Sequence, residues 1–110
     1  MKHVTVTIGI NEATSSAGHI QSDFYGLVAV QLPAVFEGTA LTFTGSIDGV
    51  TYVALYAMDG ASVYSIVVGT SRIVPVDIRV FAGLEYIKCV SNAAGGENAA
   101  TTVTLITRPV

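Results

Sequence analysis

The 110-residue sequence contains one cysteine and no tryptophan, and only 12% of its residues are charged. The single cysteine, Cys89, cannot form a disulfide within the chain, and alone it supplies neither a redox pair nor a metal site. We expect Cys89 to be a small buried side chain in a strand. A hydrophobic core must then stabilise the protein, and the length suits one domain, 1–110.

Positive charge is also scarce, since five Lys and Arg residues stand against eight Asp and Glu residues, for a net charge of −3. The charges are scattered singly, so we expect neither a nucleic-acid groove nor a polybasic membrane patch. No apolar run has the 18 residues of a membrane span, and MKHVTVTIGI alternates instead of forming the apolar block of a signal peptide. The expected mature chain begins at Met1 and folds in a cytoplasm.

Recognisable catalytic motifs are missing as well. The stretch SSAGHIQSD brings Ser15, Ser16, His19 and Asp23 together in sequence. A catalytic triad, however, needs groups that converge from rigid elements around an oxyanion hole, and this stretch has the composition of a loop. We therefore expect that the protein is not an enzyme.

The sequence offers no clear site for a metal or cofactor. His3 has no second histidine or cysteine at metal-ligand spacing. Asp48 and Asp59 each precede a glycine, but neither lies in the run of alternating acids that a calcium loop needs. No P-loop or dinucleotide fingerprint is present, so no cofactor and no metal are expected.

Apolar residues make up 51% of the chain, with many Val, Ile and Thr, and they alternate with polar residues over short segments. Alternation with period two predicts strands, and the intervening Gly, Pro, Asn, Asp and Ser predict turns. The expected fold is an all-β antiparallel β-sandwich, jelly-roll-like, with about eight strands and one short helical turn at Arg79–Leu84. The predicted strands are Lys2–Ile10, Leu27–Leu32, Ala40–Ser46, Val50–Ala57, Val63–Gly69, Arg72–Ile78, Glu85–Ser91 and Thr101–Thr107. A small domain this apolar is expected to bury part of its surface against other subunits.

The stretch SIDGVTY, residues 46–52, predicts a β-hairpin with Asp48-Gly49 at its corner. A two-residue loop would leave Val53 and Leu55 among threonines. A three-residue loop, with Gly49 in the left-handed conformation and Ser46 opposite Val50, places both side chains on the face of Leu41 and Phe43. A five-residue loop keeps the same parity, and the larger apolar burial favours an odd-length loop.

The same parity places Tyr52 and Tyr56 on the outer face of their strand. Tyrosines on the outer face of a strand have three common environments. They are covered by a loop of the same chain, they form a subunit contact, or they stack against a sugar. These three interpretations remain open.

Four stretches in a fixed order cover nearly the whole chain: VTVTIGINEATSSAGHI, LVAVQLPAVFEGTALTFTGSIDGVTYVALYAMDG, FAGLEYIKCVSN and TTVTLITRPV. This order resembles small structural proteins of tailed-phage virions from the head-and-tail gene cluster. In such proteins the Pro-aromatic corner, LTFxxSxDGxxYxxL and YIKxxS imply a β-sandwich or jelly roll that decorates the capsid or contributes to a tail or fibre. Phe36 stands nearest the corner position that is often tryptophan in the family. SIDGVTY is also similar to hairpins of discoidin-like and Asp-box domains, which implies a folding unit of Ser46, Asp48 and Tyr52.

The resemblance implies a phage virion structural protein. We expect a capsid decoration or cement protein that stabilises the head by binding between major capsid subunits. Its partners would be the major capsid protein and further copies of itself, as a homotrimer or another homo-oligomer, on the capsid surface after assembly in the host cytoplasm. The alternative is a tail or fibre-associated module that binds a host glycan or another tail protein. The residues expected at the protein interface are Tyr52, Tyr56, Lys2, His3, Arg108 and Val110.

Overall fold

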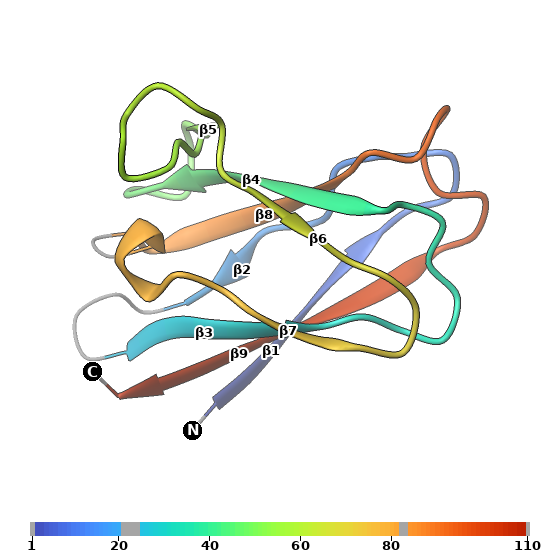
Figure 1. Ribbon diagram of the computed structural model, residues 1–110, viewed down its shortest axis with the longest axis horizontal. Helices are drawn as coiled ribbons and strands as arrows, with labels where there is room; N and C mark the ends of the chain where they lie inside the picture. Colours follow the sequence, from blue (N-terminus) through green and yellow to red (C-terminus); the bar gives the residue numbers. More distant parts are fainter. Residues whose placement is uncertain (1, 21–24, 82–83, 110) are drawn as a thin grey trace.

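The computed structural model describes residues 2–20, 25–81 and 84–109, and these form two packed antiparallel β-sheets (Figure 1). The first sheet has the strand order β1-β9-β3-β7, and the second has the order β2-β8-β4-β5, with β6 also paired to β4. A short 3-10 helix, η1 (Ile78–Phe81), follows β7. The strands are β1 (Lys2–Ile8), β2 (Gly18–His19), β3 (Tyr25–Gln31), β4 (Ala40–Ser46), β5 (Val53–Ala54), β6 (Ser65–Val67), β7 (Ile73–Pro75), β8 (Tyr86–Ser91) and β9 (Thr101–Pro109).

The strand order is that of a jelly roll. β5 and β6 pair with different halves of the same edge of β4, so they occupy the place of one interrupted strand. Counted in this way, eight strands form two four-stranded sheets of orders 1-8-3-6 and 2-7-4-5, which is the double Greek key of jelly rolls. The predicted all-β sandwich of about eight strands is therefore confirmed.

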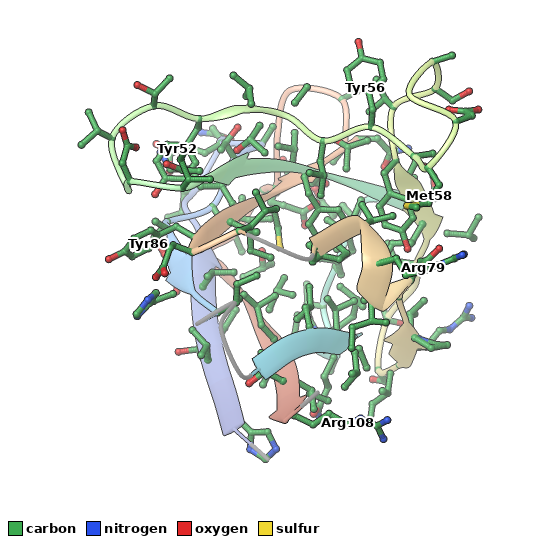
Figure 2. The ribbon with its side chains drawn as sticks, turned by 90° about the vertical axis from the view of Figure 1, so that its left-hand side faces the viewer. Tyr52, Tyr56, Met58, Arg79, Tyr86 and Arg108 are labelled. Atoms are coloured by element: carbon green, nitrogen blue, oxygen red, sulfur yellow. The ribbon has the colours of Figure 1, made fainter. Side chains whose placement is uncertain are left out.

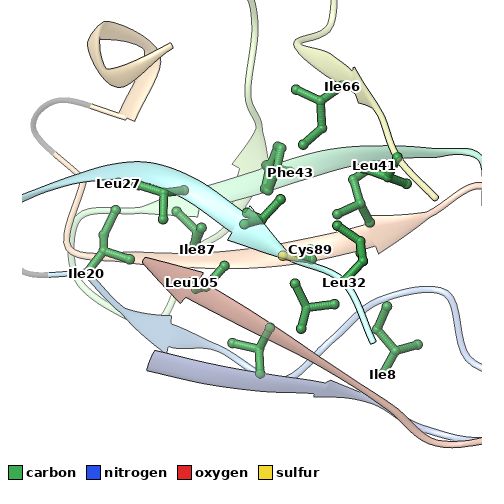
Figure 3. Close-up of a cluster of buried hydrophobic side chains, with 14 of the residues drawn as sticks. Ile8, Ile20, Leu27, Leu32, Leu41, Phe43, Ile66, Ile87, Cys89 and Leu105 are labelled. Carbon is green, nitrogen blue, oxygen red and sulfur yellow. The ribbon is translucent and has the colours of Figure 1, made fainter. Parts of the chain in front are cut away.

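The core lies between the sheets and is built by alternation along each strand (Figure 3). In β4 the side chains of Leu41 and Phe43 point inward, and Thr42 and Thr44 point outward. Cys89 on β8 faces Phe43 and is fully buried, as predicted. Each large apolar side chain buried here stabilises the fold by roughly 1.5 to 3 kcal/mol, and this burial replaces the absent disulfides.

Only Ala40–Ser46 has the predicted bounds of a strand. β1 ends at Ile8 instead of Ile10, β3 and β9 are displaced or extended by one or two residues, and the predicted segment Arg72–Ile78 forms a strand only at Ile73–Pro75. The short strand β2 lies in the stretch interpreted as a loop. Of the predicted helical turn at Arg79–Leu84, a 3-10 helix is found at Ile78–Phe81, and residues 82–83 lie outside the described residues.

The β4–β5 hairpin has the five-residue loop, the second of the two odd-length alternatives, so the predicted parity is confirmed and the pairing of Ser46 with Val50 is wrong. Because Gly45 pairs with Val53, Ser46 faces Tyr52, and five residues, 47–51, remain in the loop. Phe43 is opposite Leu55, and the backbone N–H of Leu55 donates a hydrogen bond of 3.0 Å to the carbonyl oxygen of Phe43. Leu55 packs against the core, but Val53 lies at the end of the sandwich and is exposed, so its predicted burial is wrong.

Candidate functional site

The chain leaves the sheet between β5 and β6 and forms a small hairpin, residues 55–64, which we call the arm. Tyr64 donates its backbone N–H to the carbonyl of Leu55, and both side chains pack against the core. Tyr56 and Val63, the next pair outward, are bridged and exposed. One face of the arm is therefore attached to the domain, and the opposite face is apolar and open to solvent, as Figure 2 shows for Tyr56.

The arm ends in a tight turn at Asp59-Gly60. The Oδ1 atom of Asp59 accepts hydrogen bonds from the backbone N–H groups of Ala61 and Ser62, at 2.8 and 3.0 Å. These bonds, that from Ala61 first, hold the pKa of the Asp59 carboxyl below its ordinary value. Met58 stands exposed beside this turn.

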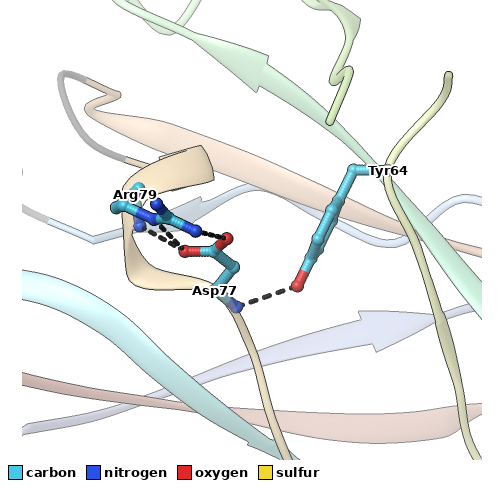
Figure 4. A network of polar contacts seen from close by, with 3 residues as sticks. All are labelled: Tyr64, Asp77 and Arg79. Atoms are coloured by element: carbon cyan, nitrogen blue, oxygen red, sulfur yellow. Dashed lines mark hydrogen bonds and ion pairs between the residues drawn. The ribbon is translucent and has the colours of Figure 1, made fainter. Parts of the chain in front are cut away.

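An aromatic cluster fixes the base of the arm. The ring of Tyr64 meets Phe81 edge-on with centroids 5.7 Å apart, and Phe81 meets Phe43 in the same way at 5.1 Å. The Tyr64 hydroxyl accepts a hydrogen bond of 2.9 Å from the backbone N–H of Asp77 (Figure 4). Asp77 in turn is paired with the Arg79 guanidinium, which lowers the pKa of the Asp77 carboxyl. The arm is thus attached to the core and to the residue before η1.

The corner at Asp48 is a polar folding unit. The hydroxyl of Ser46 donates to Asp48 Oδ1 and accepts from the N–H groups of Asp48 and Gly49. Asp48 Oδ1 also accepts from the N–H groups of Val50 and Thr51, and these bonds lower the pKa of its carboxyl. Gly49 has a φ of 79°, the left-handed conformation expected for it. These contacts occupy Asp48 within the turn.

The exposed apolar side chains are concentrated on this edge of the second sheet. Among the described residues, ten large apolar side chains are exposed, and seven of them lie between residues 47 and 67. We call these seven the apolar edge surface: Ile47, Val50, Val53, Tyr56, Met58, Val63 and Val67. A hollow of about 320 Å³ lies at one end of it, lined largely by Gly45, Ile47, Val53 and Leu84. Sparse charge and apolar side chains in this arrangement favour contact with another protein surface.

The two predicted interface tyrosines have different environments. Tyr56 is 48% exposed and stands on the outer face of the arm. Tyr52 is half-buried, and the ammonium group of Lys88 lies 4.4 Å from its ring centroid. The side chain that contacts Tyr52 thus comes from the strand β8 of the same chain, and the predicted covering loop is not what provides this contact.

A third tyrosine, Tyr86, was not singled out from the sequence. Its ring stacks on His19 with centroids 4.6 Å apart, and a Cβ added to Gly49 would lie 3.0 Å from the ring. The Tyr86 ring therefore lies against His19 and close to Gly49. His19 also bonds to Glu85 at 2.8 Å. Tyr86 thus connects β8 to His19 of β2 and lies beside Gly49 of the β4–β5 loop.

The other predicted interface residues lie at the opposite end of the fold. Lys2 and His3 belong to β1, where they pair with Thr107 and Ile106 of β9. Arg108 is exposed near the end of β9 and is labelled in Figure 2, far from Tyr56. Val110 lies outside the described residues. These residues and the apolar edge surface therefore form two separate candidate contact regions.

The serines and histidine of SSAGHIQSD have structural contacts. The hydroxyl of Ser15 is buried, donates to the carbonyl of Ser16 and accepts from the N–H of Cys89. The Ser16 hydroxyl accepts from the N–H of Thr7, and His19 contacts Glu85 and Tyr86. Asp23 lies outside the described residues. In residues 2–20, 25–81 and 84–109, no group of three or more His, Cys, Asp or Glu side chains is placed to hold a metal ion.

Sequence reasoning missed the buried Glu97. Its carboxyl group accepts hydrogen bonds from the N–H groups of Glu37 and Gly38 and from the hydroxyl of Ser91, at 2.9, 3.1 and 2.6 Å. Gly96 makes this possible, since a Cβ there would lie 2.6 Å from the backbone of Asn11. The signal in the sequence that points to this arrangement is the Gly95-Gly96 pair before Glu97. Glu97 joins loops at the end of the sandwich away from the arm.

Comparison with known proteins gave no match to any family model, curated protein or solved structure. In the described part of the chain, no helix has the length and apolar character needed to cross a membrane.

Proposed function

We propose that this protein is a non-enzymatic structural protein of a tailed-phage virion. In this proposal it is a capsid decoration protein that binds between major capsid subunits as a homo-oligomer on the capsid surface. Its mechanism is additive contact, because apolar surface buried across several copies raises the free energy needed to separate neighbouring capsid subunits.

The apolar edge surface is the observation that carries this proposal. Its seven side chains lie on one segment, and the base of the arm is fixed by the Tyr64, Phe43 and Phe81 rings. A surface that is ordered before binding loses little conformational entropy when a partner covers it. A group of seven exposed apolar side chains favours a protein that binds a partner over one that acts as a free monomer.

The jelly-roll topology is compatible with this role, because the fold occurs in viral capsid proteins. The same fold also occurs in lectins, so topology alone does not assign function. The resemblance of the sequence to small tailed-phage virion proteins is the second support.

The first experiment measures copy number in virions of the phage that encodes the chain. Quantitative gel or mass-spectrometric analysis is applied to whole virions and to heads purified without tails. A decoration protein is present in hundreds of copies and stays with the heads. A few copies that are lost with the tails contradict the head location and favour the tail or fibre module.

The second experiment tests the apolar edge surface with two matched valine variants. Val53 is 65% exposed on this surface, and Val35 is 63% exposed elsewhere. If Val53 is buried by the partner, Val53→Ser weakens binding to undecorated heads about tenfold, equivalent to roughly 1.4 kcal/mol. Val35→Ser leaves binding unchanged. Equal effects of the two changes contradict the assignment of the surface.

A further inference from the structure

The first strand of the fold has an open backbone edge. β1 pairs with β9 on one side only, and the register is continuous from Lys2 to Ile8. On the other side, the N–H of Thr7 donates to Ser16 Oγ at 3.1 Å, and the carbonyl of Thr7 accepts from the N–H of Ser16 at 2.9 Å. The backbone groups of Thr7 therefore point away from β9.

The direction of the Thr7 backbone groups also determines the direction of the backbone groups of His3 and Thr5. In an antiparallel strand the N–H and C=O of one residue point to the same side, and successive residues alternate. His3 and Thr5 are separated from Thr7 by even numbers of residues, with no register shift between them. Their backbone groups point to the open edge, and within the described part of the chain no hydrogen bond reaches them. Both residues are exposed.

The other sheet edges are shorter. β7 has three residues, ends in Pro75 and cannot extend its ladder there, since proline has no N–H. β2 and β5 have two residues each, and β6 has three. Among the described strands, β1 is thus the one long edge that presents a run of backbone donors and acceptors.

We propose that β1 of a second copy pairs with this edge, antiparallel and about a twofold axis. In this register His3 faces Thr5 of the second copy, Val4 faces Val4 of the second copy, and Thr5 faces His3. The His3–Thr5 pairs exchange four backbone hydrogen bonds, which satisfies the free backbone groups of His3 and Thr5 in both copies. The two Val4 side chains form a non-hydrogen-bonded pair, the arrangement in which opposite side chains are closest.

Three features favour a second copy as the occupant. The free groups are self-complementary, because His3 and Thr5 each present one N–H donor and one C=O acceptor to the open edge. No like charges oppose each other in this register, and Val4, which packs against the core, meets an apolar partner. Ser16 already occupies the edge at Thr7, so pairing stops there and the register cannot slide further along β1.

The contact is small. Four backbone hydrogen bonds and one valine pair bury less than the roughly 800 Å² per partner of a stable complex. The isolated dimer is therefore weak, with a Kd on the order of 100 µM or more. Such a contact acts where many copies are held together, so this inference rests on the proposed homo-oligomer for its biological setting.

Cysteine cross-linking tests the register. We compare the full chain carrying Val4→Cys with the full chain carrying Thr5→Cys, under mild oxidation at high protein concentration. Across the twofold axis, residue 4 faces itself, but residue 5 faces His3 and lies on a diagonal of about 7 to 8 Å from its own copy, too far for a disulfide. Buried Cys89 does not compete in either variant.

The expected result is that Val4→Cys forms disulfide dimers at least tenfold faster than Thr5→Cys. Random collision gives the opposite order, because Thr5 is the more exposed side chain. Equal rates, or faster cross-linking of Thr5→Cys, overturn the proposal.

A second pair of variants keeps the test decisive if Val4→Cys does not fold, as judged by circular dichroism. Thr5→Pro removes an N–H that points to the open edge and leaves the bonds to β9 in place, whereas Thr5→Ala keeps this N–H. Sedimentation equilibrium should show self-association for Thr5→Ala and its loss for Thr5→Pro. Undiminished association of folded Thr5→Pro overturns the proposal. These outcomes are independent of copy number in virions, so failure of the pairing and failure of the decoration role are distinguishable.

Discussion

The hydroxyl of Tyr64 accepts a hydrogen bond of 2.9 Å from the backbone N–H of Asp77, and this bond attaches the arm to the segment before η1. The partners are 13 residues apart in sequence and lie in different parts of the sandwich. The bond therefore holds the arm in one conformation on the surface of the domain. A surface that is ordered before binding loses less conformational entropy when a partner binds.

Removal of this hydroxyl should loosen the arm without emptying the core. Tyr64→Phe keeps the ring contacts with Phe43 and Phe81 but leaves the N–H of Asp77 without its acceptor. We expect a loss of about 1 kcal/mol in the free energy of unfolding, measured by urea denaturation. Amide exchange should increase in residues 55–64 more than in β4. Tyr56→Phe, which removes an exposed hydroxyl from the same arm, is the control and should change neither measurement.

The buried carboxyl of Glu97 should be far more important for stability than an exposed one. Glu97→Ala leaves the N–H groups of Glu37 and Gly38 and the hydroxyl of Ser91 without their acceptor, at a cost of about 1 to 3 kcal/mol for each. We expect the free energy of unfolding to fall by at least about 3 kcal/mol. Glu12→Ala, at an exposed position of the adjoining loop, should cost less than about 0.5 kcal/mol. Similar losses for the two variants contradict the assigned contacts.

The thiol of Cys89 should be inert in the folded protein. Burial raises its pKa to about 12, because the thiolate is not solvated there. At pH 8 a disulfide reagent such as DTNB should label the native protein at least ~100-fold more slowly than the protein in urea. Rapid labelling of the native state indicates that β8 opens locally, and the absence of labelling in urea is the sign of a modified thiol.

The aspartates of the turns should make stability depend on acid pH. Hydrogen bonds lower the pKa of Asp48 below 3.8, so its contribution is complete above this pH and is lost as the pH falls through the depressed folded-state value. Asp59 and Asp77 have the same direction of shift. The free energy of unfolding should therefore decrease below about pH 3.8, and it should decrease less steeply in Asp48→Asn. Urea titrations between pH 5 and 2.5 measure this difference. Glu12→Gln, away from these turns, serves as control and should retain the wild-type slope.

For the apolar edge surface, the sequence predicts which side chains share a face but not which of them are exposed. The parity of Leu41, Phe43 and Leu55 was predictable, because side chains alternate along any strand and apolar ones must find the core. The exposure of Val53 was not, since it depends on where the opposing sheet ends. The arm was also not predicted, because Tyr56 and Val63 lie in segments with the alternating pattern of strands. In the structure these two residues pair with each other and not with β4.

Four features could be predicted from the sequence alone: the all-β architecture, the inward face of β4, the turn at Asp48-Gly49 and the burial of Cys89. These follow from local rules, namely the two-residue period of strands and the backbone freedom of glycine. Three other features depend on the three-dimensional arrangement: Glu97 is buried, Tyr64 reaches Asp77, and the backbone groups of His3 and Thr5 face an open edge. Each of these depends on which distant segment lies alongside, and a pattern within one segment does not contain that information.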